Sequence, residues 1–370
     1  MKIGNKLTIL GCGHGGMALA ADLKLKGAKV ALWSDPTHAD KFNKILAKKN
    51  EIILHSNDTS KSVKLDLLSH DLTEAIHFGD ILYNCTPMLA HRQLFKNIAL
   101  HLARLQVEKL LINLSGTFSG IDQFLHVSDQ AIFNKLKIFD TSTFPYACRA
   151  GAQNDISILG KKSALTIAPL FPADIHYLDF MPDCSKPTRL HKIKNSFELG
   201  LMGTNAVFHP ATVLFNARLI DTGCSFLFYR DGISKRTSLL HDALDHERLL
   251  LAKTMGYQLN PGVDDDNKYY GTNFTNNYDF CLHSTIHKKI KSPTSLNHRF
   301  ITEDVAYGLV PLLALAKSHN IELLNIDSVV KIFSTIMGVN YYQQGRNLAG
   351  LTQKLVHELS WTTYAREQVS

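Results

Sequence analysis

The sequence predicts an α/β fold in which a doubly wound, mostly parallel sheet is followed by an all-helical C-terminal domain. Strand-length apolar runs alternate with helical patterns through the first half of the 370 residues. Few β-branched runs remain after a shift in composition near Pro182–Pro187. Alternating strands and helices are typical of a parallel sheet covered on both faces. We therefore expect an α/β domain over residues 1–185 and a helical domain over residues 186–370.

The individual elements follow from the apolar patterns. Short apolar runs bounded by turn residues indicate buried strands, and apolar residues at helical spacing indicate helices. The expected strands are 7–10, 28–33, 80–86, 109–114, 135–139 and 164–168, and a helix is expected over 91–105. In the second half, helices are expected over 190–201, 206–220, 239–255, 305–318, 329–337 and 348–359. No run of about eighteen apolar residues occurs, so we expect no membrane-spanning helix.

The stretch Gly11-Cys-Gly13-His-Gly-Gly16 stands between the first apolar run and the first helical pattern. Gly11 permits a tight turn, Gly13 lets the backbone approach a pyrophosphate, and Gly16 lets the helix pack closely on the strand. The helix N-terminus offers free N–H groups to the phosphates. With a second strand following, this context predicts a Rossmann-type dinucleotide site that includes His14 and Gly15. The alternative is a glycine-rich turn that binds no nucleotide.

Asp35 follows the second expected strand and bears on the choice of cofactor. An acidic side chain there can accept a hydrogen bond from the ribose 2′-OH of NAD and would repel the 2′-phosphate of NADP. The sequence therefore favours NAD, with NADP as the alternative, and an Asp-Pro turn is compatible with this role. Thr86-Pro87 ends the third expected strand, at the sheet edge where ligands bind in this architecture.

A polar stripe interrupts the apolar stretch 205–216. On an uninterrupted helix, Asn205, His209 and Asn216 would lie within about 40° of one another, since each residue turns the helix by about 100°. Unpaired buried polar groups are costly, so these side chains need partners. Pro210 removes one helical hydrogen bond, and we expect a kink there or two separate helices. From spacing alone, a histidine facing a cleft and a core histidine bonded to a carbonyl are equal alternatives.

Two further stretches hold candidate residues. In 299–311, Thr302 is expected to cap a helix whose first turn carries Glu303 and Asp304. A functional interpretation adds that a buried carboxylate there could orient His209 and that Arg299 could clamp a substrate carboxylate. The stretch 140–149 follows a strand at the ligand edge, and on chemistry alone it is a polar loop with a proline turn.

Charge and cysteine content favour a protein that acts on small molecules. The net charge is +7, and the lysines and arginines are dispersed. The small lysine groups at 24–29 and 288–291 are typical of solvated faces, so we expect no nucleic-acid partner. The six cysteines are widely spaced without a Cys-x-x-Cys, which favours reduced thiols in a cytosolic protein. His283 and His287 stand four residues apart without a Glu between them, and we predict no metal site.

Taken together, the motifs resemble those of the opine dehydrogenase family, typified by octopine and nopaline dehydrogenases. The resemblance covers nearly the whole chain, and the motifs occur in the family's order. They are the glycine loop at 11–16, Thr86-Pro87 with His91 after it, Thr-Ser-Thr-x-Pro-Tyr-Ala-Cys-Arg at 141–149, Asn-x-x-x-His-Pro at 205–210, and Arg-x-x-x-Glu-Asp-Val-x-x-Gly-Leu-Val-Pro at 299–311.

The resemblance implies a Rossmann domain, a helical domain and an active site between them. It implies an NAD(P)H-dependent reductive condensation of an α-keto acid, with pyruvate expected, and the amine of an amino acid. His209 would be the acid/base, Asp304 its orienting partner, and Arg299 would lie near the keto-acid carboxylate. The further substrate-binding candidates are Asp140, Thr143 and Asn205.

The sequence departs from the family's pattern at 340–342, where Asn-Tyr-Tyr replaces a common Asp-Tyr, and at two candidate site residues. His14 stands where the family usually has Asn. Asp140 stands where many relatives have Glu, at a position implicated in holding the amine of the amino acid. The shorter side chain of Asp140 could select a different amino donor.

Two other functions are alternatives. A ketopantoate reductase-like or glycerol-3-phosphate dehydrogenase-like enzyme would typically rely on a catalytic lysine in the helical domain, where this chain has His209. A dinucleotide sensor without turnover is disfavoured by the presence of both His209 and Asp304. We expect a cytoplasmic protein with no membrane partner, and the oligomeric state is left open, with a homodimer as one option.

Overall fold

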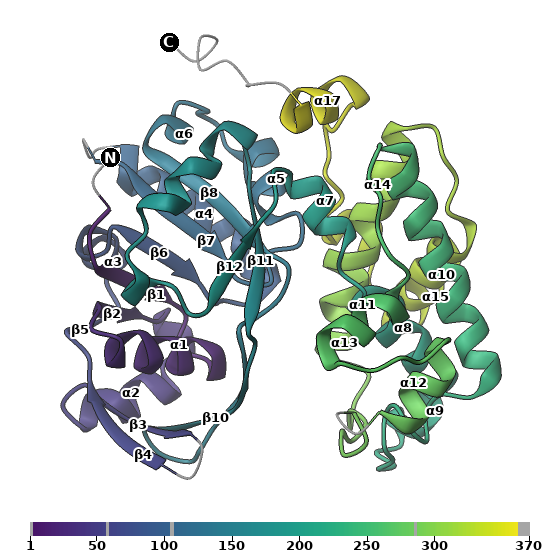
Figure 1. Ribbon diagram of the computed structural model, residues 1–370, viewed down its shortest axis with the longest axis horizontal. Coiled ribbons are helices and arrows are strands. Elements are labelled where there is room, and N and C mark those ends of the chain that lie inside the picture. Colours follow the sequence, from purple (N-terminus) through teal and green to yellow (C-terminus); the bar gives the residue numbers. More distant parts are fainter. Residues whose placement is uncertain (1–2, 57–58, 104–106, 285–286, 362–370) are drawn as a thin grey trace. The chain divides into compact units, whose positions relative to one another are not determined.

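The computed structural model describes residues 3–56, 59–103, 107–284 and 287–361. The chain divides into two units (Figure 1): unit 1 is Met1–Gly200 with Lys354–Ser370, and unit 2 is Leu201–Gln353. This division differs from the expected one at residue 185, because the boundary falls within helix α7 (Ser196–Leu201). The last helix, α17 (Gln353–Trp361), also groups with unit 1, where Asn195 Nδ2 donates to the Ser360 carbonyl at 3.1 Å.

The main sheet of unit 1 confirms the doubly wound fold. Its strand order is β12-β11-β8-β7-β6-β1-β2-β5, and all neighbouring pairs are parallel except β8 with β11. The strand order reverses between β1 and β6, which is where ligands bind in open α/β sheets. The strands are β1 (Lys6–Leu10), β2 (Lys29–Trp33), β5 (Leu67–Ser69), β6 (Ile81–Asn84), β7 (Lys109–Asn113), β8 (Leu136–Thr141), β11 (Ala164–Pro169) and β12 (Arg189–Lys192).

A second sheet in unit 1 was not expected. It has the order β4-β3-β10-β9, with β3 (Glu51–Ser56), β4 (Thr59–Lys64), β9 (Tyr146–Ala150) and β10 (Asp155–Lys161). Helix α1 (His14–Leu25) packs against strands of both sheets (Figure 1). A helix covered on opposite faces has to be apolar around most of its circumference, and α1 buries seven of its twelve residues.

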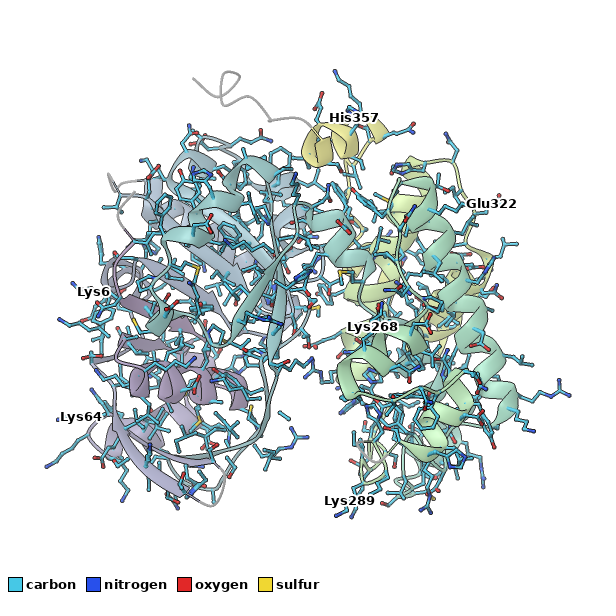
Figure 2. All side chains as sticks on the ribbon, in the orientation of Figure 1. Lys6, Lys64, Lys268, Lys289, Glu322 and His357 are labelled. Atoms are coloured by element: carbon cyan, nitrogen blue, oxygen red, sulfur yellow. The ribbon has the colours of Figure 1, made fainter. Side chains whose placement is uncertain are left out.

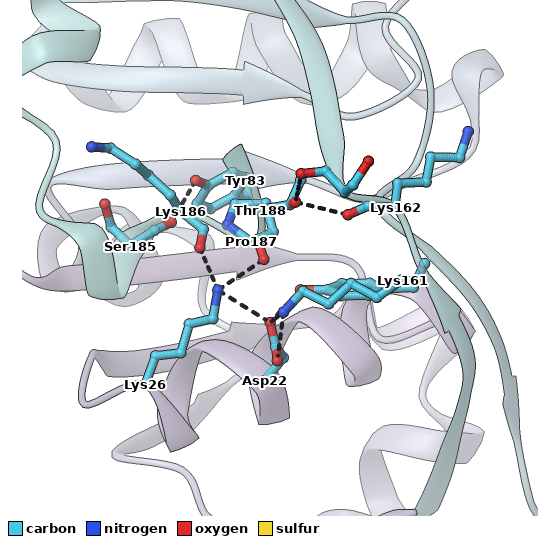
Figure 3. Close-up of polar contacts among 11 residues, drawn as sticks. Asp22, Lys26, Tyr83, Lys161, Lys162, Ser185, Lys186, Pro187 and Thr188 are labelled. Carbon is cyan, nitrogen blue, oxygen red and sulfur yellow. Dashed lines mark hydrogen bonds and ion pairs between the residues drawn. The ribbon is translucent and has the colours of Figure 1, made fainter. Parts of the chain in front are cut away.

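Polar contacts join the end of α1 to the rest of unit 1 (Figure 3). Asp22 accepts hydrogen bonds from Tyr146 Oη at 2.7 Å and from Lys161 Nζ at 2.8 Å, which attaches α1 to β9 and β10. Lys26 Nζ donates to the carbonyls of Lys186 and Pro187 at 2.7 and 2.8 Å. These bonds fix the C-terminal end of the helix whose N-terminal end carries the glycine loop.

The remaining helices of unit 1 are α2 (Asp40–Ala47), α3 (Leu72–Phe78), α4 (His91–Ala103), α5 (Ser119–His126) and α6 (Ile132–Lys135). Short helices also occur at η1 (Pro36–His38), η2 (Met88–Ala90), η3 (Pro172–Phe180) and η4 (Asp183–Ser185). The helix expected over 91–105 is confirmed as α4 as far as Ala103, and residues 104 and 105 lie outside the described residues.

Unit 2 is helical in its described residues, as expected. It contains α8 (Asn205–Phe215), α9 (Ala217–Asp221), α10 (Lys235–Thr254), α11 (Gly262–Tyr270), α12 (Asn277–His283), α13 (Arg299–Thr302), the π-helix η5 (Asp304–Leu309), α14 (Val310–Ser318), α15 (Leu324–Met337) and α16 (Tyr341–Gln344). Outside the masked segments, no helix is long and apolar enough to cross a membrane.

Several expected boundaries were wrong. Residues 190–192 belong to strand β12 and only 196–201 are helical, because β11 offers an edge that pairs with this segment. Pro210 does not separate two helices, because it lies inside α8. The break falls at Asn216, whose Nδ2 donates to the carbonyls of Thr212 and Gly232. The expected helix 348–359 begins only at Gln353.

Charged side chains that were expected on solvated faces are exposed in the structure. The side chains labelled in Figure 2, among them Lys6, Lys64, Lys268 and Lys289, are exposed. Lys288 and Lys291 are exposed as well, as expected for a solvated face.

The six cysteines are free thiols, and burial raises the pKa of Cys12 in the glycine loop to about 12.

Candidate active site

The glycine loop has the geometry that its sequence predicts. Gly11 has φ +109°, which a side chain would strain, and it follows β1 directly. A Cβ on Gly16 would overlap the Gly11 carbonyl oxygen, so only glycine lets α1 start this close to β1. A Cβ on Gly15 would overlap the Phe144 ring. A Cβ on Gly13 would meet no atom within 4 Å, so the chain itself does not require glycine there. The open side of Gly13 fits a ligand that approaches the backbone.

His14 is the first residue of α1, and its ring is bonded to strand β9. Its Nδ1 accepts a hydrogen bond from the Ala150 N–H at 3.1 Å, so the proton of the neutral ring lies on Nε2. Burial lowers the pKa of His14, and the positive charges of Lys41 and Arg149 lower it further. The ring is therefore neutral at pH 7, with one N–H donor available beside the helix N-terminus.

Asp35 is exposed just beyond β2 and caps the short helix η1. Both the backbone N–H and the hydroxyl of Thr37 donate to its Oδ1, at 2.9 and 2.6 Å. These two hydrogen bonds lower the pKa of Asp35, so the carboxylate is charged at neutral pH. The Asp-Pro turn is thus present, and the carboxylate remains exposed for a ribose hydroxyl.

Thr86-Pro87 lies beside the glycine loop, across the point where the strand order reverses. A Cβ on Gly11 would lie 3.1 Å from Thr86 Cγ2, which shows how closely the two segments approach. His91, buried at the start of α4, donates from Nε2 to the Thr86 carbonyl at 3.0 Å and contacts Ser119 Oγ through Nδ1 at 2.7 Å. This contact fixes the backbone that borders the expected nucleotide site.

A buried polar network that the sequence analysis missed connects Thr86 to Asp140. Thr86 donates to Asn84 Oδ1, Asn84 Nδ2 donates to Asn113 Oδ1 at 3.0 Å, and Asn113 Nδ2 donates to Asp140 Oδ1 at 2.9 Å. The Gly120 N–H also donates to the Asp140 carboxylate. These side chains end consecutive parallel strands, and this shared edge was the signal available in the sequence.

Asp140 is fully buried, which does not fit direct contact of its carboxylate with a substrate amine. Its position on β8 leaves it inside unit 1, where the network satisfies it. Thr143 lies three residues later on the half-buried loop before β9, and its hydroxyl accepts a hydrogen bond from Lys162 at 2.9 Å. Of these two candidates, only Thr143 has exposed surface.

Unit 2 brings His209 and Asp304 together. His209 Nδ1 lies 2.7 Å from Asp304 Oδ2, and the two side chains are 9% and 14% exposed. A carboxylate at Nδ1 fixes the tautomer and the orientation of an imidazole. The partner of His209 at Nδ1 is thus a carboxylate and not the backbone carbonyl that one of the two alternatives required.

The local structure around Asp304 explains how the pair forms. Asp304 begins the π-helix η5, which packs on α8. Pro311 has no N–H to donate to the Tyr307 carbonyl, so the regular α-helical ladder is interrupted at the end of η5. A Cβ on Gly308 would lie 2.5 Å from the Ala206 Cβ, so glycine permits the close approach of η5 to α8. Single-turn π-helices occur frequently at functional sites.

Thr302 does not cap a helix, contrary to expectation. It ends α13, whose N-cap is His298, and its hydroxyl donates back to the His298 carbonyl at 3.4 Å. The tertiary packing of η5 on α8 overrides the local capping preference. Arg299 begins α13 and pairs with Glu303 at 3.0 Å with 65% of its side chain exposed, and Asn205 is exposed at the start of α8. Both candidates have surface available to a ligand.

Aromatic side chains enclose His209. Phe300 stacks on its ring at 3.9 Å with an interplanar angle of 25°, and Phe228 meets it at 6.0 Å. Tyr229, which the sequence analysis missed, places its hydroxyl 2.9 Å from His209 Nε2. The Tyr229 ring lies 4.4 Å from that of His287, and burial lowers the pKa of His287 to about 4. His287 is thus a packing residue, while His283 is exposed.

A pocket of about 500 Å³ lies elsewhere in unit 1 and contains none of the predicted site residues. Its lining is mainly charged and includes Lys26, Asp179, Asp183, Lys186, Arg189 and Lys192. Several of these charges already pair with one another, as Lys186 does with Asp183 and Lys192 with Asp179. This pocket therefore does not coincide with the candidate site.

Two known protein families match this chain, each mainly within one unit. The α-helical domain of NAD/NADP octopine/nopaline dehydrogenases matches residues 192–337, and the N-terminus of NAD-dependent glycerol-3-phosphate dehydrogenases matches residues 6–130. An opine dehydrogenase from Arthrobacter sp. (strain 1C) is 27% identical over 343 residues, which cover 93% of this chain and 94% of the relative.

Solved structures share the fold. A structure of octopine dehydrogenase with NADH and L-arginine has a TM-score of 0.78 at 18% identity, covering 95% of this chain and 97% of that one. Yersinopine dehydrogenase with NADP+ bound has a TM-score of 0.71 at 14% identity, covering 96% of this chain and 97% of that one. The order of domains, from a Rossmann-type unit to a helical one, is the same as that predicted from the sequence.

Proposed function

This chain belongs to the opine dehydrogenase family of oxidoreductases, and on that premise we propose that it catalyses the reductive condensation of an α-keto acid with the amine of an amino acid. NADH is the proposed reductant. The bond of 2.7 Å between His209 Nδ1 and Asp304 Oδ2 is the observation that carries the proposal. A histidine held in this way can deliver and accept a proton near neutral pH.

The glycine loop is the proposed site of the dinucleotide. The positive φ of Gly11, the open side of Gly13 and the close packing at Gly16 fit a pyrophosphate at the N-terminus of α1. Asp35 would bind the ribose 2′-OH, which favours NADH, and NADPH is the alternative. When bound, the reduced nicotinamide supplies a hydride to the substrate.

The chemistry requires a proton at one step. The amine adds to the keto carbon, and loss of water from this adduct needs a proton on the departing oxygen. His209 supplies that proton, and Asp304 holds the imidazole in place through Nδ1. Reduction of the resulting imine gives an N-(carboxyalkyl) amino acid.

Arg299 is proposed to bind the carboxylate of the keto acid. Its side chain is 65% exposed, and Glu303 pairs with its Nη2, so the remaining N–H groups can form a bidentate contact. Pyruvate is the proposed keto acid, with Thr143 and Asn205 as further contacts. For Asp140 we propose only the interior role described above, because its carboxylate is buried.

The test measures NADH oxidation with pyruvate or 2-oxoglutarate, each with and without pooled amino acids, and identifies the product by mass. Condensation requires both organic substrates and gives a product in which they are joined through nitrogen. Oxidation of NADH by the keto acid alone would instead indicate a simple keto-acid reductase. No oxidation across a broad panel, together with tight NADH binding, would favour a sensor.

A further inference from the structure

The hydroxyl of Tyr229 is hydrogen-bonded to Nε2, the second ring nitrogen of His209. Asp304 Oδ2 lies 2.7 Å from Nδ1, and Tyr229 Oη lies 2.9 Å from Nε2. Both nitrogens therefore already have a partner within unit 2. A proton that leaves His209 through Nε2 has to pass through the Tyr229 hydroxyl, or the tyrosine has to move away first.

The surroundings of Tyr229 oppose such a movement. Its ring lies 4.4 Å from the His287 ring at 35° and meets the Phe228 ring edge-on at 5.2 Å. Phe228 is fully buried, and its N–H donates to the Ile290 carbonyl at 2.8 Å, which anchors the turn that carries Tyr229. A Cβ on Gly232, at the end of this turn, would overlap the Phe228 carbonyl oxygen. The turn is thus tightly packed, and the hydroxyl is held at Nε2.

A phenol hydroxyl suits this position because it can donate one hydrogen bond and accept others. When His209 is neutral, with its Nδ1 proton toward Asp304, Nε2 accepts the Tyr229 proton. When His209 is protonated, Nε2 donates to Tyr229 Oη. Burial raises the pKa of Tyr229, so the phenol keeps its proton at neutral pH. Rotation of one O–H group is enough to satisfy both states of the histidine.

We propose that Tyr229 is the group that contacts the substrate oxygen and that it relays a proton to this oxygen from His209 Nε2. The inference rests on the proposed function and adds a second residue to it. As the imidazolium gives its Nε2 proton to Tyr229 Oη, the original Tyr229 proton passes to the hydroxyl oxygen of the amine adduct. The C–O bond breaks, the nitrogen lone pair forms the C=N bond, and water leaves. His209 ends neutral and Tyr229 is unchanged, so atoms and charge balance without another reactant.

The direct test replaces Tyr229 with Phe, which keeps the ring and removes the hydroxyl. We expect kcat for condensation to fall by about 10²- to 10⁴-fold, the usual contribution of a positioned acid. The KM for the keto acid, NADH binding and the melting temperature should change little, because packing is kept. Tyr278→Phe is the matched control, since Tyr229 and Tyr278 pack against the same hydrophobic cluster, which includes Phe208, Phe280 and Val263. A Tyr229→Phe enzyme with wild-type kcat would overturn the relay.

A second measurement uses the unaltered protein and does not depend on a variant that folds. In single turnovers followed by NADH absorbance in mixtures of H2O and D2O, a relay moves two protons in one step. The rate should then depend on the deuterium fraction along a curve. A purely structural role for Tyr229 predicts a straight line or no dependence, and either result would contradict the proposal.

Failure of the relay can be separated from failure of the proposed function. If His209→Gln is inactive while Tyr229→Phe is fully active, His209 remains the acid/base and only the relay is wrong. If His209→Gln also retains turnover, the acid/base assignment itself is wrong. The relay stands only if both variants lose kcat while both still bind NADH.

Discussion

At the scale of single residues, the imidazole of His209 has a different kind of partner at each nitrogen. Asp304 contributes a negative charge at Nδ1, and Tyr229 contributes a neutral hydroxyl at Nε2. Phe300 stacks on the ring and limits its rotation. The sequence pointed to His209 through the polar stripe in 205–216 and to Asp304 through the acidic pair in 299–311, and the family motifs supported both. Tyr229 is twenty residues from His209 and carries no motif, so only the folded chain reveals its contact.

The exposed carboxylate of Asp35 should decide between the two cofactors. Asp35→Arg replaces a charge that repels a 2′-phosphate with one that attracts it, so the ratio of kcat/KM for NADPH to that for NADH should rise. Steady-state kinetics with both cofactors measure this ratio. Asp40→Arg is the control, because Asp40 is exposed five residues later and the charge change is the same. An unchanged ratio in Asp35→Arg would remove Asp35 from the cofactor site.

Two histidines packed inside unit 2, the buried His241 and the half-buried His287, should make stability depend on pH. Burial lowers the pKa of His241 to about 3 and that of His287 to about 4, whereas an unfolded histidine titrates near 6.5. Below pH 6.5 the unfolded chain binds protons that the folded chain does not, so the free energy of unfolding falls as the pH is lowered toward 4. Between pH 7 and 5.5 the loss should be about 1 kcal/mol for each histidine.

Urea unfolding at these two pH values checks this expectation. Between pH 7 and 5.5, the free energy of unfolding should fall less in His241→Gln than in the parent protein. The fall should be smaller by the contribution of one histidine, which is about half of what the two contribute together. His246→Gln is the comparison, because His246 lies on the same helix but is exposed. A variant of His241 with the same pH dependence as the parent would show that the buried ring is not the cause.

At the scale of elements, the predictable parts of the fold are those with strong local patterns. The apolar runs of β1, β2, β6 and β7 identified the core of the main sheet. The second sheet escaped prediction because strand β4, Thr-Ser-Lys-Ser-Val-Lys, is almost entirely polar and mostly exposed. The π-helix η5 also escaped, because its cause is the combination of Pro311 with tertiary packing on α8.

The contact between η5 and α8 should be essential to the His209–Asp304 pair. Gly308→Ala places a Cβ where the Ala206 Cβ lies 2.5 Å away, which forces the two elements apart. We expect a loss of stability of about 1–3 kcal/mol, as for overpacked cores, and a lower kcat. Differential unfolding and NADH oxidation measure the two effects.

The compensating variant makes this test specific. Ala206→Gly removes the atom that the new Cβ would meet, so the double variant Ala206→Gly/Gly308→Ala should recover kcat relative to Gly308→Ala alone. Glycine within α8 costs about 1 kcal/mol of stability, so the double variant should remain less stable than the parent protein by about this amount. If the double variant is no better than Gly308→Ala, the clash with Ala206 is not what separates the elements.

At the scale of the whole molecule, the candidate site residues belong to two different units. The glycine loop and Asp35 belong to unit 1, while His209, Asp304 and Arg299 belong to unit 2. The alternation of strands and helices predicted the order of these units, because that pattern is local. The boundary at residue 200 and the grouping of α17 with unit 1 depend on contacts between distant segments, such as Asn195 with Ser360.

The central claim is that His209 provides the acid–base chemistry of an NADH-dependent condensation. The most direct measurement determines kcat and the Kd for NADH in His209→Gln, assayed with both the keto acid and the amino acid. We expect kcat to fall by about 10²- to 10⁴-fold while the Kd for NADH is unchanged, because the glycine loop lies in the other unit. A His209→Gln enzyme that keeps most of its kcat and forms the condensed product would contradict the claim.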